Sequence, residues 1–437
     1  MWSEPKDGLG VAVRLPAAPA LDVSANAYFF CACSLPAARA SKPRPSASRT
    51  EALSWRTMIP PLSILRLSVL STGLIWATLS SFSPSSSFLQ DDPASRPSQA
   101  ERTNPNTVVW EGTEGPGLGK HIVFLAGDHE YRGEESLPAL ARILAKSYGF
   151  KCTFIVTTNA ETGYIEPGSS HITNLGVLRD ADLMVVFLRF QHFADEQMQH
   201  IDDYLQTGKP VIGLRTSTHA FAGLKGKFER YNEGYAGYGD EPGTEGDSWK
   251  QGFGEEILGE HWVGHFGGNH TQSSNLLLEP GQHGHAILRG VLRPHAVTGG
   301  YVGHPVEGST TLLRGQVLDG MTPSSPPATN EKQLVQHSVA WVRTYQPGNA
   351  KSRVFATTHG GSEDLLSPDF RRLILNAHLW CLGLEESIRP DGPIDFIGPF
   401  NPVTFSFGGY RRGVKPSDIE GFETPIYDAT KATSDEK

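Results

Sequence analysis

The sequence contains little cysteine and no excess of positive charge. The first argues against a zinc or redox-motif protein, and the second against a nucleic-acid-binding protein. Only four of its 437 residues are Cys, and none of them forms a CxxC or zinc-knuckle spacing. We therefore expect Cys152 and Cys381 to be buried free thiols, the first in a strand and the second in a helix. The formal net charge is −9. Because a phosphate backbone is bound by a basic face, we expect no nucleic-acid partner.

Glycine-rich phosphate-binding motifs are also missing. The expected strand-to-helix turns contain neither GxGxxG nor GK followed by Ser or Thr. Dinucleotide-binding and P-loop sites depend on these glycines for close approach of the backbone to phosphate. The sequence therefore predicts neither kind of site, and we expect the protein to work without a cofactor.

The apolar stretch near the N-terminus is too short for a comfortable membrane span. Leu67–Leu79 is 13 residues long and follows Met58 and Arg66, which is the layout of a secretory signal. We predict that translation starts at Met58, with residues 1–57 a mis-annotated or disordered extension and 58–88 a signal peptide or N-terminal anchor. The protein is then extracytoplasmic, either periplasmic or secreted, and is attached to a membrane only if this segment is not cleaved.

Beyond a Pro- and Ser-rich linker at 89–118, the pattern of residues 119–385 alternates between strand and helix. Apolar strands are expected at 121–126, 152–156, 183–188, 210–214, 276–278, 310–313, 337–341 and 353–357. Helices are expected at 136–148, at 195–205 with Asp195 as its N-cap, and at 368–382. This alternation is typical of a mostly parallel sheet with right-handed crossovers. A long loop excursion at 223–275 interrupts it, and 386–437 forms an irregular C-terminal tail.

Clusters of polar and ionisable side chains follow four of the expected strands. Because the carboxyl ends of parallel strands meet at one edge of a sheet, we expect these clusters to converge there on a ligand crevice. The residues we select are Asp128, His129, Glu130 and Arg132 after the first strand, Arg189 after the third, Arg215, Thr216 and His219 after the fourth, and His359 and Gly360 after the last.

Several of these residues also have a structural interpretation. Glu134 and Glu135 begin a helix, where acids complement the macrodipole, so a capping role is favoured for them. Arg189 and Arg215 each end an apolar strand, where an unpaired cation is costly. Their partner is therefore either a carboxylate of the cluster or an acid or hydroxyl group of a ligand. His219 is as well suited to capping its helix as to chemistry.

Two specific mechanisms find little support in the sequence. The turn after residues 210–214 has the layout of a nucleophile elbow, but Arg215 and Thr216 stand there without the Gly-x-Ser-x-Gly frame. His261, His265 and His270 lie among glycines, which do not favour a metal-binding helix. We predict no metal site, and we expect His265 to contact a ligand instead.

The stretch from about Lys120 to Leu384 resembles the ThuA-like family, named for trehalose utilisation, within the class I glutamine amidotransferase-like superfamily. The matching segments are Gly127–Arg132, Gly208–Arg215 with His219, His265–Gly268, His285–Val291, Arg353–Gly360 and Phe370–Trp380. The resemblance implies a flavodoxin-like three-layer α/β/α fold without the amidotransferase cysteine. It also implies a link to disaccharides, including oxidised (keto) sugars. Arg215 stands where family members often have His.

Two functions follow as hypotheses, both with a sugar or sugar derivative as the small-molecule partner. The first is a carbohydrate-active enzyme of hydrolase or isomerase type. Asp128, His129, Glu130, His219 and His359 would be its catalytic groups, and Arg132, Arg189, Arg215, Thr216, His265 and Gly360 would bind substrate. The second is a non-catalytic sugar-binding module, favoured by aromatic residues expected to be exposed in the excursion: Tyr231, Tyr235, Tyr238 and Trp249. The oligomeric state does not follow from the sequence.

Overall fold

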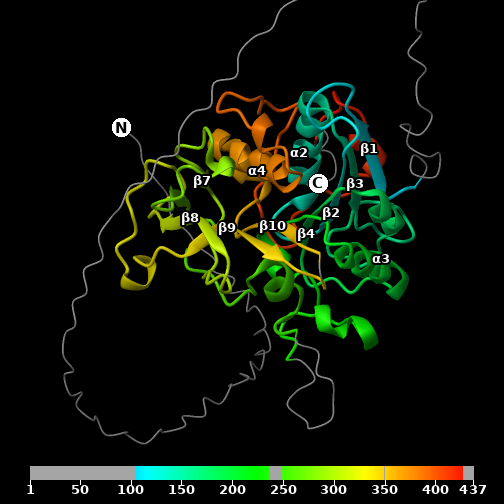
Figure 1. The fold of residues 1–437 in the computed structure, drawn as a ribbon, viewed down its shortest axis with the longest axis horizontal. Coiled ribbons are helices and arrows are strands. Elements are labelled where there is room, and N and C mark those ends of the chain that lie inside the picture. The colour runs from blue at the N-terminus through cyan, green and yellow to red at the C-terminus, as the bar shows by residue number, and fades with distance from the viewer. Residues whose placement is uncertain (1–103, 237–248, 349, 427–437) are drawn as a thin grey trace, which may run out of the picture. The chain divides into compact units, whose positions relative to one another are not determined.

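A ten-stranded mixed sheet runs through the computed structural model, which describes residues 104–236, 249–348 and 350–426 (Figure 1). The strand order is β1-β3-β2-β4-β5-β10-β9-β8-β6-β7. In chain order the strands are β1 (Thr107–Glu111), β2 (His121–Gly127), β3 (Lys151–Val156), β4 (Leu183–Leu188), β5 (Val211–Leu214), β6 (Ser274–Leu278), β7 (His295–Ala296), β8 (Thr310–Val317), β9 (Ser338–Tyr345) and β10 (Ser352–Thr357).

The five strands β3, β2, β4, β5 and β10 are adjacent and parallel, and this part of the sheet matches the expectation from the sequence. The remaining pairings are antiparallel, with β1 on one side and β9, β8, β6 and β7 on the other. Parallel neighbours need a long crossover, usually a helix, whereas consecutive strands joined by a shorter connection pair antiparallel. The chain reverses between β8, β9 and β10 without a long helix, so this half of the sheet is a meander.

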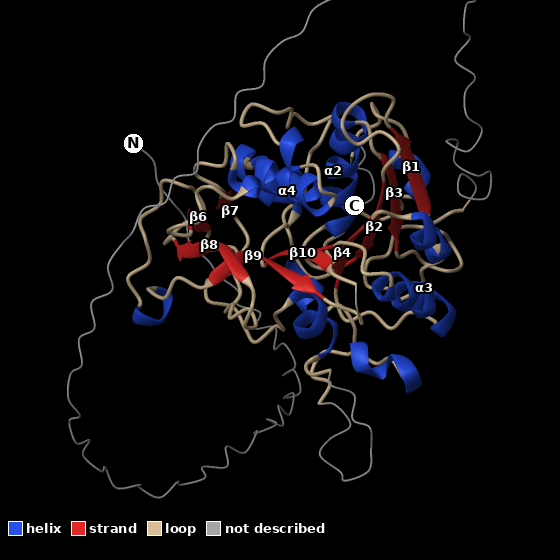
Figure 2. Cartoon of the chain, in the orientation of Figure 1, coloured by secondary structure: helices blue, strands red, loops and turns tan. Residues whose placement is uncertain are grey.

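Helices cover both faces of the sheet (Figure 2). Helices α2 (Gly133–Tyr148) and α4 (Pro368–Cys381) pack with Phe124 into one apolar cluster, and α3 (Asp195–Gln206) packs with Val123 into a second. Successive side chains of a strand point to opposite faces, so β2 supplies both clusters in turn. This alternation explains why the strand is apolar throughout and fully buried.

The helix ends differ from the sequence predictions in two places. Helix α2 begins at Gly133, three residues earlier than expected, because Arg132 adopts a left-handed conformation (φ 63°) that ends the preceding turn. Asp195 is not the N-cap of α3: Ala194 precedes the helix, and Asp195 lies in its first turn. An acid in that position still complements the helix dipole. In α4 the Ser367 hydroxyl caps the helix by accepting a hydrogen bond from Phe370 N at 3.4 Å.

The segment expected to be a linker contains a strand. β1 pairs antiparallel with β3, and Trp110 is 2% exposed. Its indole Nε1 donates to Gly421 O at 2.8 Å, which joins this edge of the sheet to the C-terminal segment. Arg142 of α2 holds the same segment by donating to Thr424 O at 2.6 Å and to Ile419 O at 2.7 Å. The C-terminal segment, residues 386–426, thus packs on β1 and α2.

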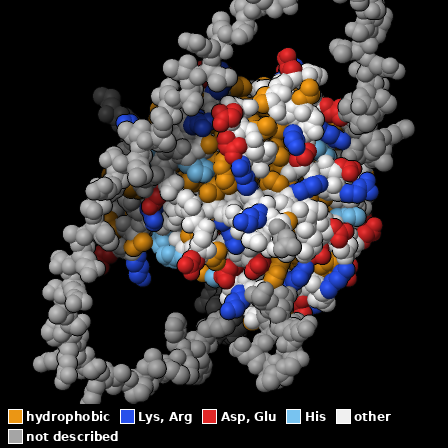
Figure 3. Space-filling view, viewed as in Figure 1, with side chains coloured by type: hydrophobic (Ala, Val, Ile, Leu, Met, Phe, Trp, Pro, Cys, Tyr) orange, Lys and Arg blue, Asp and Glu red, His pale blue; other side chains and the backbone are white. Residues whose placement is uncertain are grey.

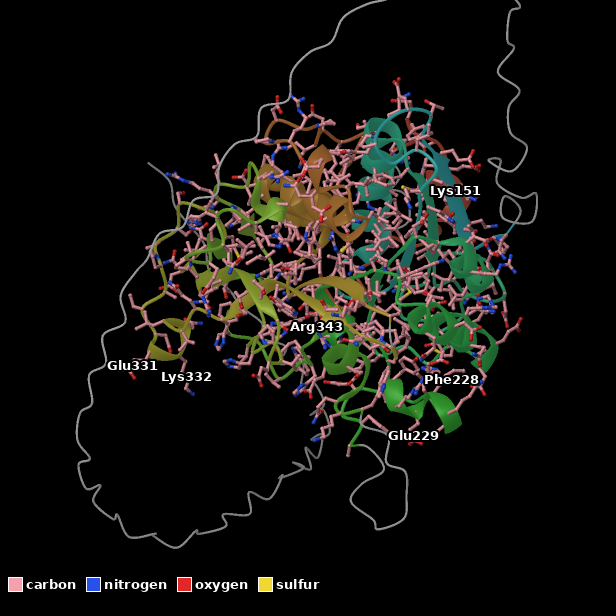
Figure 4. All side chains as sticks on the ribbon, in the orientation of Figure 1. Lys151, Phe228, Glu229, Glu331, Lys332 and Arg343 are labelled. Atoms are coloured by element: carbon pink, nitrogen blue, oxygen red, sulfur yellow. The ribbon has the colours of Figure 1, made fainter. Side chains whose placement is uncertain are left out.

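The described part of the excursion around Glu255 and Glu256 packs against the sheet. Arg343 of β9, labelled in Figure 4, donates to Glu255 O and Glu256 O, both at 2.9 Å. The expectation of exposed aromatics here is wrong for Tyr231 and Trp249, whose rings pack 4.9 Å apart in the apolar core. Tyr238 lies outside the described residues, and Tyr235 is half-buried.

Three remaining observations concern the thiols, the surface charge and the helices. Cys152 and Cys381 are buried and free, as expected. On the face seen in Figure 3, basic and acidic side chains are interspersed. None of the helices in the described ranges is long and apolar enough to cross a membrane. Leu67–Leu79 lies outside those ranges.

Candidate functional site

The carboxyl ends of β2, β4 and β5 are joined by hydrogen bonds, and this brings three of the four expected clusters together. Arg189 N donates to Gly127 O at 3.0 Å, and Phe190 N donates to His219 O at 3.0 Å. The buried amide of Gln191 donates to Gly127 O at 2.7 Å. The backbone after each strand is therefore fixed relative to the others, which is a condition for a preorganised site.

Asp128 shapes the turn after β2. Its Oδ1 accepts hydrogen bonds from Glu130 N at 2.8 Å and from Tyr131 N at 2.5 Å. The carboxylate is fully buried, and its Oδ2 has no hydrogen-bond partner within the described structure. A buried carboxylate oxygen without a partner is costly. Asp128 therefore acts on the backbone of this turn through Oδ1.

Glu130 and His129 both face the guanidinium of Arg189. Arg189 Nη1 lies 3.0 Å from His129 Nε2, and Arg189 Nε lies 3.9 Å from Glu130 Oε2. Burial raises the pKa of Glu130, while a hydrogen bond with Tyr131 opposes the shift. Burial, and then the charge of Arg189, lowers the pKa of His129. Arg189 therefore interacts with a carboxyl group and with an imidazole that is neutral at pH 7.

Arg215 occupies the strained turn between β5 and the short helix η3 (Arg215–His219), with φ of 50°. Its guanidinium carbon lies 4.0 Å from the ring centre of Tyr131 and 4.3 Å from that of Tyr301. Nη1 donates to Gly299 O at 2.5 Å and Thr358 O at 2.6 Å. Among the described residues this buried cation forms no ion pair with a carboxylate, and its partners are two aromatic faces and two carbonyls. In the described chain Nε and Nη2 remain without a partner.

His219 is surrounded by aromatic rings. Its ring centre lies 5.0 Å from Phe190, 5.2 Å from Trp262 and 5.8 Å from Tyr301. Burial lowers its pKa well below the usual value, and Arg189 adds to the effect. The imidazole is therefore neutral at pH 7 and can accept a proton only through a change in its surroundings.

His359 belongs to a buried polar chain that begins at Asp364. Asp364 Oδ2 accepts from the Thr298 hydroxyl at 2.7 Å and from Gly360 N at 2.9 Å. The same hydroxyl lies 3.1 Å from His359 Nδ1. Burial lowers the pKa of His359 to about 3. Its Nε2 lacks a hydrogen-bond partner among the residues described, so it is a free acceptor in the tautomer with Nδ1 protonated.

Arg132 and the following acids are directed away from this group. Arg132 donates to Ser406 O and, at 3.2 Å, to Glu134 Oε1. Glu135 Oε2 accepts from Val403 N at 3.0 Å. These residues therefore attach the C-terminal segment to the start of α2. Burial raises the pKa of Glu134 to about 7 and that of Glu135 well above its usual value, so the macrodipole interpretation describes only part of their role.

The hydroxyls at the start of η3 differ in their surroundings. The Ser217 hydroxyl oxygen lies 2.6 Å from Val186 O and 2.8 Å from Leu214 O, so its single proton is donated to a backbone carbonyl. Thr216 is fully buried, and within the described part its Oγ1 has no partner. Neither Ser217 nor Thr216 has the hydrogen bond to an imidazole that activates a nucleophile.

The three loop histidines do not meet. His261 Nδ1 lies 2.9 Å from Glu255 Oε2, His265 packs edge-on to Tyr301 at 5.0 Å, and His270 stacks on Phe405 at 4.2 Å. Over the described ranges there is no group of three or more His, Cys, Asp or Glu side chains that could hold a metal ion. Of the three, His265 contacts Tyr301, which lies against Arg215.

Together these contacts form one continuous wall, which we call the aromatic-cationic wall. It consists of His129, Glu130, Tyr131, Arg189, Phe190, Arg215, His219, Trp262, His265, Tyr301 and Phe407. Phe407 is 63% exposed and lies 4.9 Å from the Arg189 guanidinium. Arg215 and Tyr301 are buried at its base, while His265 and Phe407 reach solvent.

The sequence did not predict Tyr301, Trp262 and Phe407 as members of the site, whereas Asp364 belongs to the polar cluster that follows residues 353–357. Phe407 is one of several aromatics in the tail, which was the only signal for it. Tyr301 and Trp262 come from the excursion and the following loops, where no periodicity places them relative to the sheet.

Two cavities lie away from the wall. One of about 950 Å3 lies beside β6 and is lined by Leu276, Leu278, His283, Leu292 and Pro294, among others. The other, of about 230 Å3, lies between the loop after β3 and the C-terminal segment. Neither includes Glu130, Arg189 or His219 in its lining. The site is therefore defined by convergent side chains at a sheet edge and not by either cavity.

The structure defines a mixed α/β protein with a polar site at the carboxyl edge of its parallel strands. It is similar in fold to two solved proteins described as ThuA-like, the family that the sequence motifs predicted. One, from Parabacteroides merdae, is 14% identical with a TM-score of 0.35, over 66% of this chain and 97% of that one. The other, from Bacteroides uniformis, is 12% identical with a TM-score of 0.37, over 64% and 96%.

A further solved structure is similar to a comparable degree and has a different description. A cytoplasmic protein from Salmonella typhimurium is 9% identical with a TM-score of 0.33, over 60% of this chain and 98% of that protein. The sequence matches no protein-family model and no curated protein. Likenesses this distant carry no argument about activity, which rests on the site itself.

Proposed function

We propose that the protein is a carbohydrate-active enzyme that uses acid/base chemistry at the carboxyl edge of its parallel strands. The observation that carries this proposal is the pairing of Glu130 with Arg189 inside the aromatic-cationic wall. Sugars present hydroxyl groups at their edges and C–H groups on their faces. A wall that alternates charged groups with aromatic rings complements both.

Glu130 is the proposed acid/base group. A catalytic acid works best when its pKa is close to the operating pH, and burial raises the pKa of this carboxyl in that direction. Arg189 lies close enough to stabilise negative charge on a carboxylate or on a substrate oxygen. Asp128 holds the backbone of Glu130 in place, so we propose a positioning role for Asp128.

His219 and His359 are the proposed neutral partners. Both have a lowered pKa, so each can act as a hydrogen-bond acceptor at pH 7. His219 lies beside Phe190 and Trp262 in the wall. Arg215, Thr216, His265 and Gly360 are the proposed substrate-binding residues, whereas Arg132 binds Glu134 and the C-terminal segment.

A non-catalytic sugar-binding module is the second candidate. One observation favours it: Arg215, at the elbow position of the fold, is enclosed by two tyrosines, and the adjacent Ser217 is bound to backbone carbonyls. Such a module would keep the wall for recognition and carry out no reaction. The aromatic residues first expected to serve it, Tyr231 and Trp249, are in the core and do not contribute.

Two further proposals concern architecture and location. The order β3-β2-β4-β5-β10 of the parallel strands supports a flavodoxin-like arrangement for the centre of the sheet. The layout of residues 58–79 supports export of the protein from the cytoplasm. Fractionation of cells that produce the full chain, with and without residues 58–88, tests the second point.

The enzyme and the module are distinguished by one pair of measurements. Purified protein is incubated with trehalose and with its keto derivative, and products are separated by chromatography, while calorimetry records binding of the same sugars. Product formation supports the enzyme, binding without product supports the module, and neither binding nor product contradicts both.

A further inference from the structure

A small cavity of about 230 Å3 lies outside the proposed catalytic wall. Its lining comes from two segments far apart in sequence, the loop at 159–166 after β3 and the C-terminal residues 410–413. Backbone hydrogen bonding fixes these segments to each other, because Ile165 N donates to Val414 O at 2.8 Å. The cavity is thus a feature of the folded C-terminal segment.

The floor of the cavity is a built polar turn. Asn159 Oδ1 accepts from Glu161 N and Thr162 N, both at 3.0 Å, and Asn159 Nδ2 donates to Glu166 Oε2 at 2.9 Å. These bonds hold the half-buried carboxylate of Glu166 at the cavity. A carboxylate has about four lone-pair sites, so Glu166 can accept further hydrogen bonds from a ligand.

Aromatic and cationic side chains provide the rest of the lining. The Tyr164 ring is 40% exposed, while Tyr410 is 9% exposed with the Arg412 guanidinium 3.8 Å from its ring centre. Arg412 Nη2 also donates to Gly408 O at 3.1 Å. The Arg412 side chain is therefore fixed next to a tyrosine ring, across the same small space as Glu166.

We propose that this cavity is a second carbohydrate site that binds one pyranose ring. Cavities that hold drug-sized ligands span about 300–1,000 Å3, so a volume below that range fits a single ring. The lining offers both a carboxylate acceptor and a guanidinium donor, which suits a neutral ligand with several hydroxyls better than an ion of either sign. Lys415 Nζ lies 5.3 Å from the ring centre of Tyr164. The exposed part of this ring supplies an apolar surface for the C–H groups of the sugar.

The chain segment that lines the cavity is also attached to the proposed catalytic wall, at His129. Gly408 N donates to His129 O at 2.8 Å, and Gly168 lies against the His129 side chain. The segment that carries Tyr410 and Arg412 also carries Phe407 of the wall. The second site rests on the proposed function for its ligand class.

The test uses full-length protein and three variants: Tyr164→Ala, Tyr164→Phe and Glu166→Gln. Isothermal titration calorimetry measures binding of D-glucose, of maltotetraose and of sorbitol, which has the hydroxyls but no ring. We expect Tyr164→Ala and Glu166→Gln to weaken glucose binding at least about tenfold, while Tyr164→Phe retains it. Equal affinity for glucose and maltotetraose identifies a free sugar as the ligand, and tighter binding of maltotetraose identifies a longer glycan.

Unchanged glucose affinity in Tyr164→Ala, or sorbitol binding equal to glucose, overturns the second site, as does the absence of any sugar binding by the wild type. Thermal unfolding confirms that the variants are folded. Glu130→Gln separates this inference from the catalytic proposal. Glucose binding that depends on Tyr164 but not on Glu130 supports the second site even if no turnover is found. Turnover together with glucose binding that is unchanged in Tyr164→Ala supports the catalytic proposal and overturns the second site.

Discussion

The guanidinium of Arg215 lies 4.3 Å from the ring centre of Tyr301, although the two residues are far apart in sequence. Tyr131 covers the opposite side at 4.0 Å. Arg215 therefore links the turn after β5 to the loop before β8, and it does so without a carboxylate partner. This arrangement turns a strained strand-to-helix turn into the base of the candidate site.

Replacement of Arg215 by Met tests the stability of this arrangement. The variant leaves the carbonyls of Gly299 and Thr358 without their donor and removes two cation-aromatic contacts. We expect the free energy of unfolding in urea to fall by about 2–4 kcal/mol. Tyr301→Phe keeps the ring and serves as the control. An Arg215→Met protein within about 0.5 kcal/mol of wild type would contradict the structural role.

The chain from Asp364 through Thr298 to His359 predicts a defined tautomer. Thr298→Val removes the hydroxyl that lies 3.1 Å from His359 Nδ1. We expect the Nδ1 proton of His359 to lose its slow exchange with solvent in NMR spectra, and turnover to fall about tenfold or more. Thr298→Ser retains the hydroxyl and should behave like the wild type. A spectrum of Thr298→Val identical to wild type would refute this assignment.

The pH dependence of stability follows from the same histidine. The pKa of His359 is lowered to about 3 in the folded protein, against about 6.5 in an unfolded chain. Between these values the unfolded state binds more protons, so this group's contribution to stability is present above pH 6.5 and is lost as the pH falls towards 3.

Comparison with His359→Gln separates this contribution from that of the buried acids. The raised pKa of Glu134 lowers stability as the pH rises from 4.5 to 7, which is the opposite direction. We expect the wild type to lose about 1.4 kcal/mol more per pH unit than the variant between pH 6 and 4. The measurement is urea unfolding at several pH values. Parallel curves for the two proteins would show that His359 is not buried as described.

The C-terminal segment is predicted to depend on Arg142. Arg142→Met removes the donors to Thr424 O and Ile419 O, so the segment should detach more often and be cleaved faster by protease. We expect an increase of about fivefold or more in the cleavage rate, since the loss of about 1 kcal/mol changes an opening equilibrium by that factor. Arg179→Met, at an exposed surface pair, is the control. Equal cleavage rates in both variants would argue against the anchor.

Sequence patterns predicted the parallel centre of the sheet and the residues that follow its strands. The run from Leu183 to Leu188 is apolar throughout because both faces of the strand are covered, and its short length favours a buried strand over a helix. The same logic placed Glu130, Arg189 and His219 at one edge. Their roles in binding or catalysis stay predictions.

The rest depended on contacts that no local pattern encodes. β1 is a short apolar run inside a Pro- and Ser-rich segment, and it is stabilised by Trp110 contacting Gly421, at the other end of the chain. Tyr301 and Phe407 come from loops without periodicity, and their place in the wall follows from how those loops return to the sheet. For the same reason the contact between Arg215 and Tyr301 could not be predicted from the sequence.

The most direct test of the central claim is the effect of Glu130→Gln on turnover. The substitution preserves size and removes the carboxyl group that lies 3.9 Å from Arg189. General acid/base catalysis contributes about 10²–10⁴-fold, so kcat/KM for the sugar substrate should fall by at least about 100-fold. In the wild type, kcat/KM should change with pH about an apparent pKa above the usual Glu value, and the variant should lack that step. The exposed Glu114→Gln protein should match the wild type, whereas a Glu130→Gln enzyme with unchanged kcat/KM and pH profile would contradict the account.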